Sequence, residues 1–448
     1  MLMKADGLKL GLEQAYSAPK TTFIPEPMPE SDNELLPLRR RRRRDGRGWM
    51  PPEHNDTETS FSAQRTYSRR QALRIGAATI AGVVGTVYRM DINATKMELS
   101  KTRAYLLPVY DAANVDDRHK AIVITAGFGN LNSEPTAIAA SEYAQYENVY
   151  ATLLDDKGIE IGALANVTAD FADGRFVSEL EFGGYSMGGL IDLAIASKIH
   201  ASNPNMKVSA VHLYNTPSDG DTLWPWTRDQ GDTMVDMLSV FKDAEYSRIN
   251  RFLVETFGAR WHEINEFGSD GSGGSNPLFI DPQKLYNVAK YVLKEKIFND
   301  DAASTALLQS QFKFILASGA RDDILALGEK NKFEKKPPEI IYYRPVDPSA
   351  DGVVNTVDAS KAFAEYCKEA NLTFIDVQVE GIGHADPIQH TLEHSAAIRA
   401  VHLARLSMKE RSYTMISDKL TLPYAIKAED KTYNVIITAY PRSSIAPA

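Results

Sequence analysis

Ser186 lies in the sequence GYSMGG, with a glycine two positions before it and another two positions after it. A serine hydroxyl is a poor nucleophile at neutral pH. A hydrolytic serine therefore needs a histidine to take its proton, a carboxylate to orient that histidine, and donors for the oxyanion. The pattern G-x-S-x-G is a weak signal by itself, because about one chain in ten of this length would contain it by chance. The partners must come from elsewhere in the chain.

A histidine that could serve this serine lies in the sequence GIGHADP. This turn follows the β-rich run FIDVQVE (Phe374–Glu380), which places His384 beyond the C-terminal end of a strand. Of the nine histidines, His384 alone lies in a glycine-rich turn of this kind. His390, His394 and His402 belong to the helix that follows. Their spacing resembles metal ligation, but no third ligand group converges on them, so we interpret them as helix-face residues.

The acid should follow the preceding strand. After the run EIIYYRP comes VDPSADGVVN, which contains Asp347 and Asp351. Asp351 is the preferred acid, because DGVV leads into a helix that begins near Asp358. Asp347 remains the alternative, and Asp322 and Asp323 in GARDD are more distant candidates.

Two backbone amides are candidates for the oxyanion site. One belongs to Met187, which directly follows the serine, and the other to Phe128 in the loop AGFGN. Gly127 and Gly129 would let the backbone of this loop approach a substrate oxygen closely.

These residues need strands and helices to position them, and the chain alternates between the two. Buried strands are predicted from continuous β-rich runs, and helices from the segments between them. The predicted strands are Ala121–Gly127, Asn148–Leu154, Val177–Gly184, Val208–Asn215, Glu339–Pro345 and Phe374–Glu380. The predicted helices are Ala137–Tyr146, Ile161–Phe171, Met187–His200, Ala359–Ala370 and Thr391–Leu406. This alternation predicts an α/β fold with a mostly parallel, helix-covered sheet.

In this order and these places, the motifs AGFGN, GYSMGG, VDPSADGVVN and GIGHADP resemble those of the α/β-hydrolase superfamily. The resemblance implies a mostly parallel central sheet of about eight strands covered by helices. It also implies a core formed by residues 101–216 and 337–406, and a helical cap inserted at 217–336. That insertion is helix-rich and has one flexible interruption, GSDGSGGSNP. Residues 407–448 are expected to be a C-terminal tail, in which LTLPYAI and YNVIITAY could be short strands.

The activity implied is that of a serine hydrolase that cleaves a carboxylic ester, thioester or amide through an acyl-enzyme on Ser186. His384 would act as base and then acid, Asp351 would hold the imidazole, and no metal or organic cofactor would be needed. The expected substrate is a small ester-like molecule. Carbon–carbon bond hydrolases, cofactor-free haloperoxidases and acyltransferases share the fold and stay open as alternatives. A membrane-tethered binding module without activity is a further alternative.

One strand departs from the pattern. The run before the serine carries Glu179 and Glu181, where an uninterrupted apolar run is usual for a buried strand. The sequence offers no firm account of Glu181.

The N-terminal segments point toward a membrane. Residues 1–67 are predicted to be disordered, with scattered prolines and the six-arginine run Arg39–Arg44. Residues 68–90 resemble a twin-arginine export signal or a short membrane anchor. We therefore expect a membrane-associated or exported protein that contacts lipid through this segment, with a cytoplasmic location as the alternative.

The composition narrows the remaining choices. The net charge of −9 argues against nucleic acid as the main partner. Cys367 is the single cysteine in the sequence, which excludes a disulfide within the chain and a cysteine-based metal site.

Overall fold

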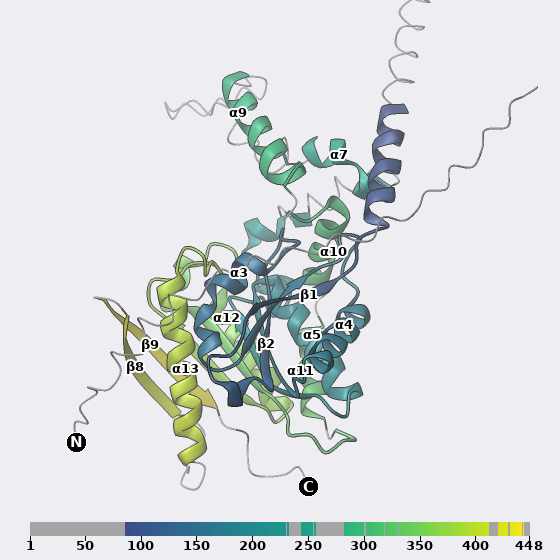
Figure 1. Ribbon diagram of the computed structural model, residues 1–448. Helices are drawn as coiled ribbons and strands as arrows, with labels where there is room; N and C mark the ends of the chain where they lie inside the picture. The colour runs from purple at the N-terminus through teal and green to yellow at the C-terminus, as the bar shows by residue number, and fades with distance from the viewer. Residues whose placement is uncertain are drawn as a thin grey trace, which may run out of the picture. The chain divides into compact units, whose positions relative to one another are not determined.

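The centre of the protein is a sheet of parallel strands with antiparallel strands at both edges (Figure 1). This computed structural model describes residues 86–229, 231–232, 243–253, 255–256, 282–299, 302–317, 319–329, 331–411, 420–428, 431–440 and 442. Within them the sheet has nine strands, in the order β1-β3-β2-β4-β5-β6-β7-β9-β8. Their bounds are β1 Tyr105–Tyr110, β2 Lys120–Thr125, β3 Asn148–Leu153, β4 Glu179–Tyr185, β5 Lys207–Tyr214, β6 Glu339–Pro345, β7 Thr373–Val379, β8 Leu420–Ala428 and β9 Lys431–Tyr440.

The strands from β3 to β7 are parallel neighbours, whereas β1 pairs antiparallel with β3, and β9 with β7. The prediction of a mostly parallel α/β sheet is confirmed. The described sheet has nine strands rather than about eight, because β8 and β9 extend it beyond β7. The expected boundary at residue 407 falls inside α13 (Thr391–Arg411) and leaves these two strands outside the core.

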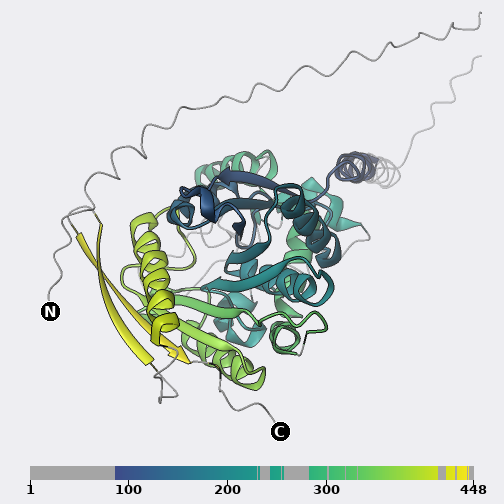
Figure 2. The ribbon, with the colours of Figure 1, turned by 60° about the horizontal axis from the view of Figure 1, so that its bottom comes forward.

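Helices cover both faces of the sheet, and each face has its own apolar core (Figure 2). One layer contains α4 (Ile161–Gly174), α5 (Met187–Ser202), α11 (Ala320–Gly328) and α12 (Thr356–Glu369). The other contains α3 (Glu134–Ala139), the short helix η2 (Ser141–Gln145) and α13. Strand residues alternate between the layers, as in β2, where Val123 faces the first and Ile122 the second.

The expected helix Ala137–Tyr146 is two shorter helices. Helix α3 begins earlier, at Glu134, with a proline in its first turn, where the missing amide hydrogen costs nothing. The backbone leaves the helical region at Ala140, with φ −86° and ψ 27°, and η2 begins at the next residue.

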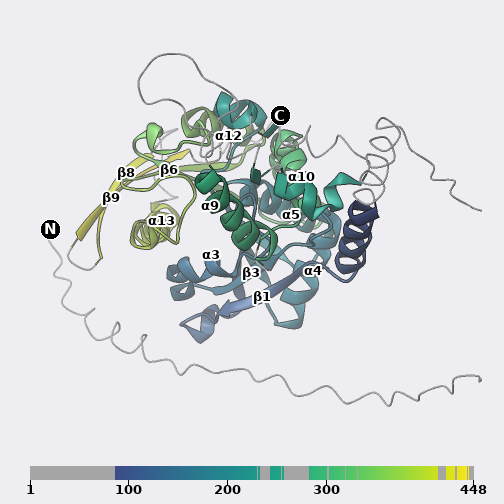
Figure 3. The same ribbon diagram turned by 90° about the horizontal axis from the view of Figure 1, so that it is seen from above.

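The segment between β5 and β6 is helical, as Figure 3 shows from above. Its described helices include η3 (Gly220–Thr222), η4 (Ala244–Tyr246), α7 (Arg248–Leu253), α9 (Pro282–Val292), η6 (Leu293–Ile297), α10 (Thr305–Leu316) and α11. Helix α11 packs against α5, and Ser197 of α5 donates a hydrogen bond to Asp323 at 2.8 Å. The last part of the expected cap therefore belongs to the helical layer of the sheet. The division into core and cap stays a prediction, since the described residues all fall within one unit, residues 67–448.

Three predictions fall wholly or largely outside the described residues. They are the disordered tail 1–67, the export or anchor segment 68–90, of which only residues 86–90 are described, and the flexible interruption GSDGSGGSNP. The chain is helical over residues 86–99. Among the helices that the structure describes, none has the length and apolar character needed to cross a bilayer.

Candidate active site

Ser186 stands on a tight turn between β4 and α5. Its backbone has φ 53° and ψ −122°, a region that residues with a side chain rarely adopt and that costs about 1–3 kcal/mol. The Ser186 amide donates a hydrogen bond to the carbonyl oxygen of Tyr214 in β5 at 2.7 Å. This contact with the neighbouring strand helps to hold the strained turn.

The flanking glycines are required by close backbone contacts. A Cβ at Gly184 would lie 2.2 Å from the Gly189 nitrogen, and a Cβ at Gly188 would lie 2.2 Å from the Thr125 carbonyl oxygen. Both distances are far inside van der Waals contact and involve backbone atoms that cannot swing away. The glycine spacing around the serine is thus a packing requirement of the turn.

His384 approaches the serine from the loop that follows β7. Its Nε2 lies 3.0 Å from Ser186 Oγ, and its Nδ1 lies 2.9 Å from Asp351 Oδ2. An ionised carboxylate can only accept, so the Nδ1 hydrogen points at Asp351 and Nε2 accepts from the serine hydroxyl. This is the arrangement that a general base for Ser186 requires.

Asp351 follows β6 and is 1% exposed. Its Oδ1 accepts hydrogen bonds from the amides of Val353 and Val354 at 2.9 Å each, and its Oδ2 accepts from Asn215 Nδ2 at 2.8 Å. Burial alone would raise the pKa of Asp351. The hydrogen bond and charge of His384, together with the two amides, outweigh burial and hold this pKa below its ordinary value.

A parallel sheet, a strained serine between a strand and a helix, and an acid and a histidine after later strands are the parts of one known architecture. The chain has the α/β-hydrolase fold. The resemblance predicted from the sequence is confirmed at the level of the fold.

Comparisons with solved structures yield matches of low sequence identity. They include a carboxylesterase from Nitrososphaera gargenis, with 12% identity, 69% of this chain and 96% of that chain covered, and a TM-score of 0.39. A hydrolase from Pseudomonas aeruginosa has 11% identity, coverages of 66% and 92%, and a TM-score of 0.37. A lipase-esterase related protein from Clostridium acetobutylicum has 13% identity, coverages of 68% and 98%, and a TM-score of 0.36. No family model and no curated protein match the chain.

The other candidate acids lie away from the serine. Asp347 is exposed and accepts hydrogen bonds from the amide and hydroxyl of Ser349, within its own turn. Asp322 and Asp323 lie in the first turn of α11, where Asp323 is bonded to Ser197. Of the four aspartates, the structure brings Asp351 alone into contact with His384.

The two candidate oxyanion donors lie on either side of the serine. The Met187 amide is the first of α5, and the amides of a first helical turn have no partner within their helix. The loop after β2 passes close by, since a Cβ at Gly127 would lie 3.3 Å from Ser186 Cβ. The Phe128 amide in that loop donates to no acceptor within the described part of the chain. Both amides are therefore available to a substrate oxygen.

Three further residues, not predicted from the sequence, hold the site together. Asn215 has φ 49°, contacts Asp351, and donates from Nδ2 to the carbonyl oxygen of Gly383 at 3.2 Å. Trp224 Nε1 donates to the Asp351 carbonyl oxygen at 2.8 Å. Gln311 of α10 accepts from the Gly129 amide at 2.9 Å and so holds the loop AGFGN, the candidate oxyanion loop (residues 126–130). Asn215 had a signal, since a polar residue ends the β-rich run VSAVHLYN.

A cavity of 830 Å³ opens onto Ser186 and His384. Its walls combine the oxyanion loop with the segment between β5 and β6, and they carry apolar side chains. The apolar lining includes Phe128, Leu223, Trp226, Leu308, Phe312, Ile315, Val353 and Ile388. Phe128 and Phe312 meet edge to face, with ring centroids 6.2 Å apart. The cavity can therefore hold an apolar group next to the serine.

His394 and His402 lie on α13 as predicted, whereas His390 precedes the first residue of that helix, and both helix histidines have aromatic neighbours. His394 is buried with its ring centroid 5.7 Å from Tyr185 and 5.5 Å from Tyr214, and burial lowers its pKa to about 3.

The rings of Tyr185, Tyr214 and Tyr343 stack in sequence across β4, β5 and β6, with centroids 4.3 Å and 4.1 Å apart. Over the described ranges, no three acidic, histidine or cysteine side chains are grouped to hold a metal ion.

Proposed function

We propose that this protein is a serine hydrolase that cleaves a carboxylic ester, thioester or amide through an acyl-enzyme on Ser186. The single observation that carries the proposal is the hydrogen-bonded chain Ser186 Oγ–His384–Asp351, with links of 3.0 Å and 2.9 Å. A role in ligand binding alone would not require all three groups in this order.

In the proposed reaction, His384 Nε2 takes the hydroxyl proton while Ser186 Oγ bonds to the substrate carbonyl carbon. The carbonyl oxygen becomes an oxyanion, which the amides of Met187 and Phe128 stabilise. The tetrahedral intermediate then collapses, the bond to the leaving group breaks, and the imidazolium gives its proton to that group. Water repeats the sequence on the acyl-enzyme, releasing the acid and restoring the serine.

Asp351 serves the reaction by stabilising the imidazolium and holding its tautomer. Its carboxylate stays ionised because two backbone amides, Asn215 and His384 all donate to it. The apolar lining of the cavity favours a substrate with an apolar acyl or aryl group, a small ester-like molecule in the simplest case.

A fluorophosphonate probe tests the nucleophile directly, because it reacts covalently only with an activated serine. We expect labelling of the wild-type protein at Ser186, none in Ser186→Ala, and unchanged labelling in Ser141→Ala, which alters an exposed serine. A folded wild-type protein that resists the probe would refute the hydrolase and favour a binding module of the same fold.

A substrate panel distinguishes ester hydrolysis from the other reactions of the α/β-hydrolase superfamily. A panel of p-nitrophenyl esters of increasing chain length should be hydrolysed, with a preference for chains that fill the cavity. Labelling by the fluorophosphonate without hydrolysis of any ester would instead favour a carbon–carbon bond hydrolase, an acyltransferase or a haloperoxidase, which keep the same three residues.

A further inference from the structure

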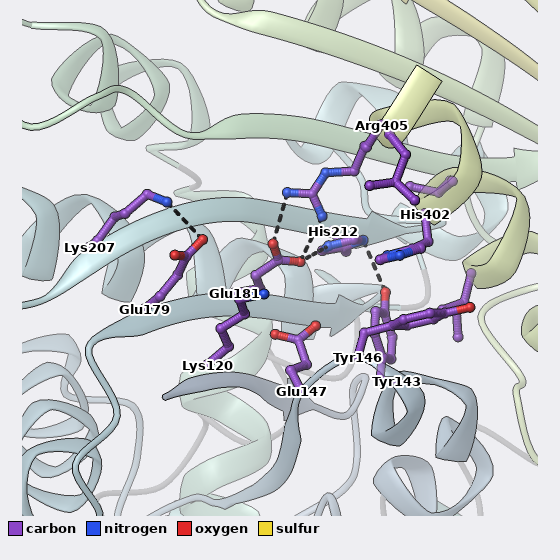
Figure 4. A pocket seen from close by; sticks show the side chains of 13 residues that line it. Lys120, Tyr143, Tyr146, Glu147, Glu179, Glu181, Lys207, His212, His402 and Arg405 are labelled. Carbon is purple, nitrogen blue, oxygen red and sulfur yellow. Dashed lines mark hydrogen bonds and ion pairs between the residues drawn. The ribbon is translucent and has the colours of Figure 1, made fainter. Parts of the chain in front are cut away.

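A second pocket, of 210 Å³, lies at the other end of β4 from Ser186 (Figure 4). It is lined by residues of β2, β4 and β5, by η2 and the turn after it, and by the second half of α13. It shares no lining residue with the cavity at the serine. The two pockets are therefore separate sites.

Glu181, the unexplained acid in the strand before the serine, lines this pocket. Both of its oxygens accept hydrogen bonds from Arg405 of α13, at 2.8 Å and 3.1 Å, and one also lies 2.9 Å from His212 Nε2. Burial would raise the pKa of Glu181, but Arg405 and His212 outweigh burial and hold this pKa well below its ordinary value. Glu181 is a buried, ionised and fully partnered carboxylate.

Glu147 is different, although it lies beside Glu181. It is 5% exposed, and its carboxyl group accepts no hydrogen bond from any described residue. Figure 4 shows this carboxyl group pointing into the pocket, toward Glu181. Burial, and then the charge of Glu181, raise the pKa of Glu147 well above its ordinary value. The carboxyl group faces the pocket and accepts no hydrogen bond from the described residues, so an N–H donor bound in the pocket would have a free acceptor there.

The charges of Arg405 and Lys120 lower the pKa of Glu147 but do not outweigh burial, and neither side chain donates a hydrogen bond to it. Each cation around the pocket already contacts a carboxylate: Lys207 with Glu179 at 2.8 Å, Lys120 with Asp117 at 2.7 Å, and Arg405 with Glu181 at 2.8 Å and Glu339 at 2.7 Å. Burial lowers the pKa of His212, which is therefore neutral at neutral pH. Arg405 with its two carboxylate partners, Glu181 in the pocket and Glu339 outside the pocket lining, carries one net negative charge, and ionised Glu147 would add a second.

We propose that this pocket binds a small organic cation with N–H donors, a primary ammonium or guanidinium group, with Glu147 as its counter-ion. The donors would satisfy the unpartnered carboxyl group, and the positive charge would offset the excess negative charge around it. The stacked rings of Tyr146 and His402, with centroids 3.8 Å apart, form a wall of the pocket. On binding, the Glu147 carboxyl group loses its proton to solvent, so binding strengthens as the pH rises.

Methylguanidinium and its neutral isostere N-methylurea test the proposal, compared at equal millimolar concentration and equal ionic strength. We expect methylguanidinium to raise the melting temperature of the wild-type protein at pH 7, whereas N-methylurea does not. A ligand that binds only the folded state must stabilise it. The rise should disappear in Glu147→Gln and persist in Glu134→Gln, which removes an exposed carboxylate. Ser186→Ala should respond like wild type, which separates this site from the hydrolase.

Equal shifts with the cation and the neutral isostere would overturn the proposal, as would an undiminished shift in Glu147→Gln. The wild-type protein supplies a second measurement should Glu147→Gln fail to fold. At pH 5 the cation must compete with the proton on Glu147, so its effect must be smaller than at pH 7. A shift that does not fall with pH would refute the role of Glu147.

Discussion

Asp351 illustrates how single residues acquire their properties from neighbours in this protein. Three donors besides His384 hold its carboxylate, and one of them, Asn215, also holds the loop before His384. The distance between the acid and the histidine therefore depends on an asparagine that does not react.

Asn215→Ala should lower the rate of fluorophosphonate labelling at Ser186 by roughly ten- to a hundredfold, because a hydrogen bond to a charged group contributes about 1.5–3 kcal/mol. Labelling at the wild-type rate in a folded Asn215→Ala protein would show that Asn215 is not needed to position the acid.

Asp351→Asn should lower ester hydrolysis by about 10⁴-fold, since it favours the wrong tautomer of His384. Asp347→Asn is the matched control, because Asp347 is exposed and bonds only within its own turn. Its hydrolysis rate should stay within about twofold of wild type. The reverse result would make Asp347 the acid.

Glu147→Gln should stabilise the protein at neutral pH. The pKa of Glu147 in the folded protein is raised above its ordinary value. The protonated carboxyl group therefore favours folding at a pH below the ordinary value, and this stabilisation is lost as the pH rises from there toward the folded-state pKa. Urea unfolding of the two proteins should agree near pH 4 and diverge steadily above it, with the variant more stable. Equal stabilities at pH 7 would contradict the raised pKa.

The site residues that stand in a short sequence motif could be predicted from the sequence. The site residues that act through contacts with distant parts of the chain could not. Ser186 and His384 stand in glycine-rich turns directly after strands, so their positions were predictable without a structure. Gln311 holds the oxyanion loop across 182 positions of the chain, and Asn215 reaches Asp351 across 136. Neither separation leaves a pattern in a single sequence.

Between elements, a buried ion-pair network centred on Arg405 joins α13 to β4 and β6. Arg405→Met would leave Glu181 buried with one of its partners gone, at a cost of about 3–5 kcal/mol in the free energy of unfolding. The double variant Arg405→Met/Glu181→Leu should recover much of this loss, because it removes the stranded charge as well. Urea unfolding measures both, and no recovery would mean that the arginine stabilises chiefly by packing.

Which segments form strands and which form helices was largely predictable from the sequence, but helix breaks and the contacts between elements were not. The alternation of apolar strands with helices predicted the parallel centre of the sheet. The runs LTLPYAI and YNVIITAY were expected as possible short strands and form most of β8 and β9. The break at Ala140 and the pairing of β9 with β7 depend on tertiary contacts, and α13 packs against both β8 and β9. Glu181 interrupts the apolar run of β4 because Arg405 neutralises it inside the fold. The two residues lie 224 positions apart, so the sequence alone could not explain the buried acid.

At the scale of the whole molecule, β8 and β9 cover an edge of β7 that would otherwise be exposed. Deleting residues 420–440 should produce concentration-dependent aggregation, because an uncovered strand offers unpaired backbone groups to other copies. Sedimentation velocity would measure it. Adding Gln378→Lys to the deletion should reduce the aggregation if edge pairing is its cause, because a charged edge resists such pairing.

The stacked tyrosines have a practical consequence. Tyr185 directly precedes Ser186, the proposed nucleophile, and its ring lies nearly parallel to that of Tyr214, at 6°, with Tyr343 beyond at 14°. Parallel aromatic rings this close couple their electronic transitions, which gives strong near-ultraviolet circular dichroism. This protein therefore carries a built-in optical signal for the integrity of the turn at Ser186, readable without substrate, probe or label.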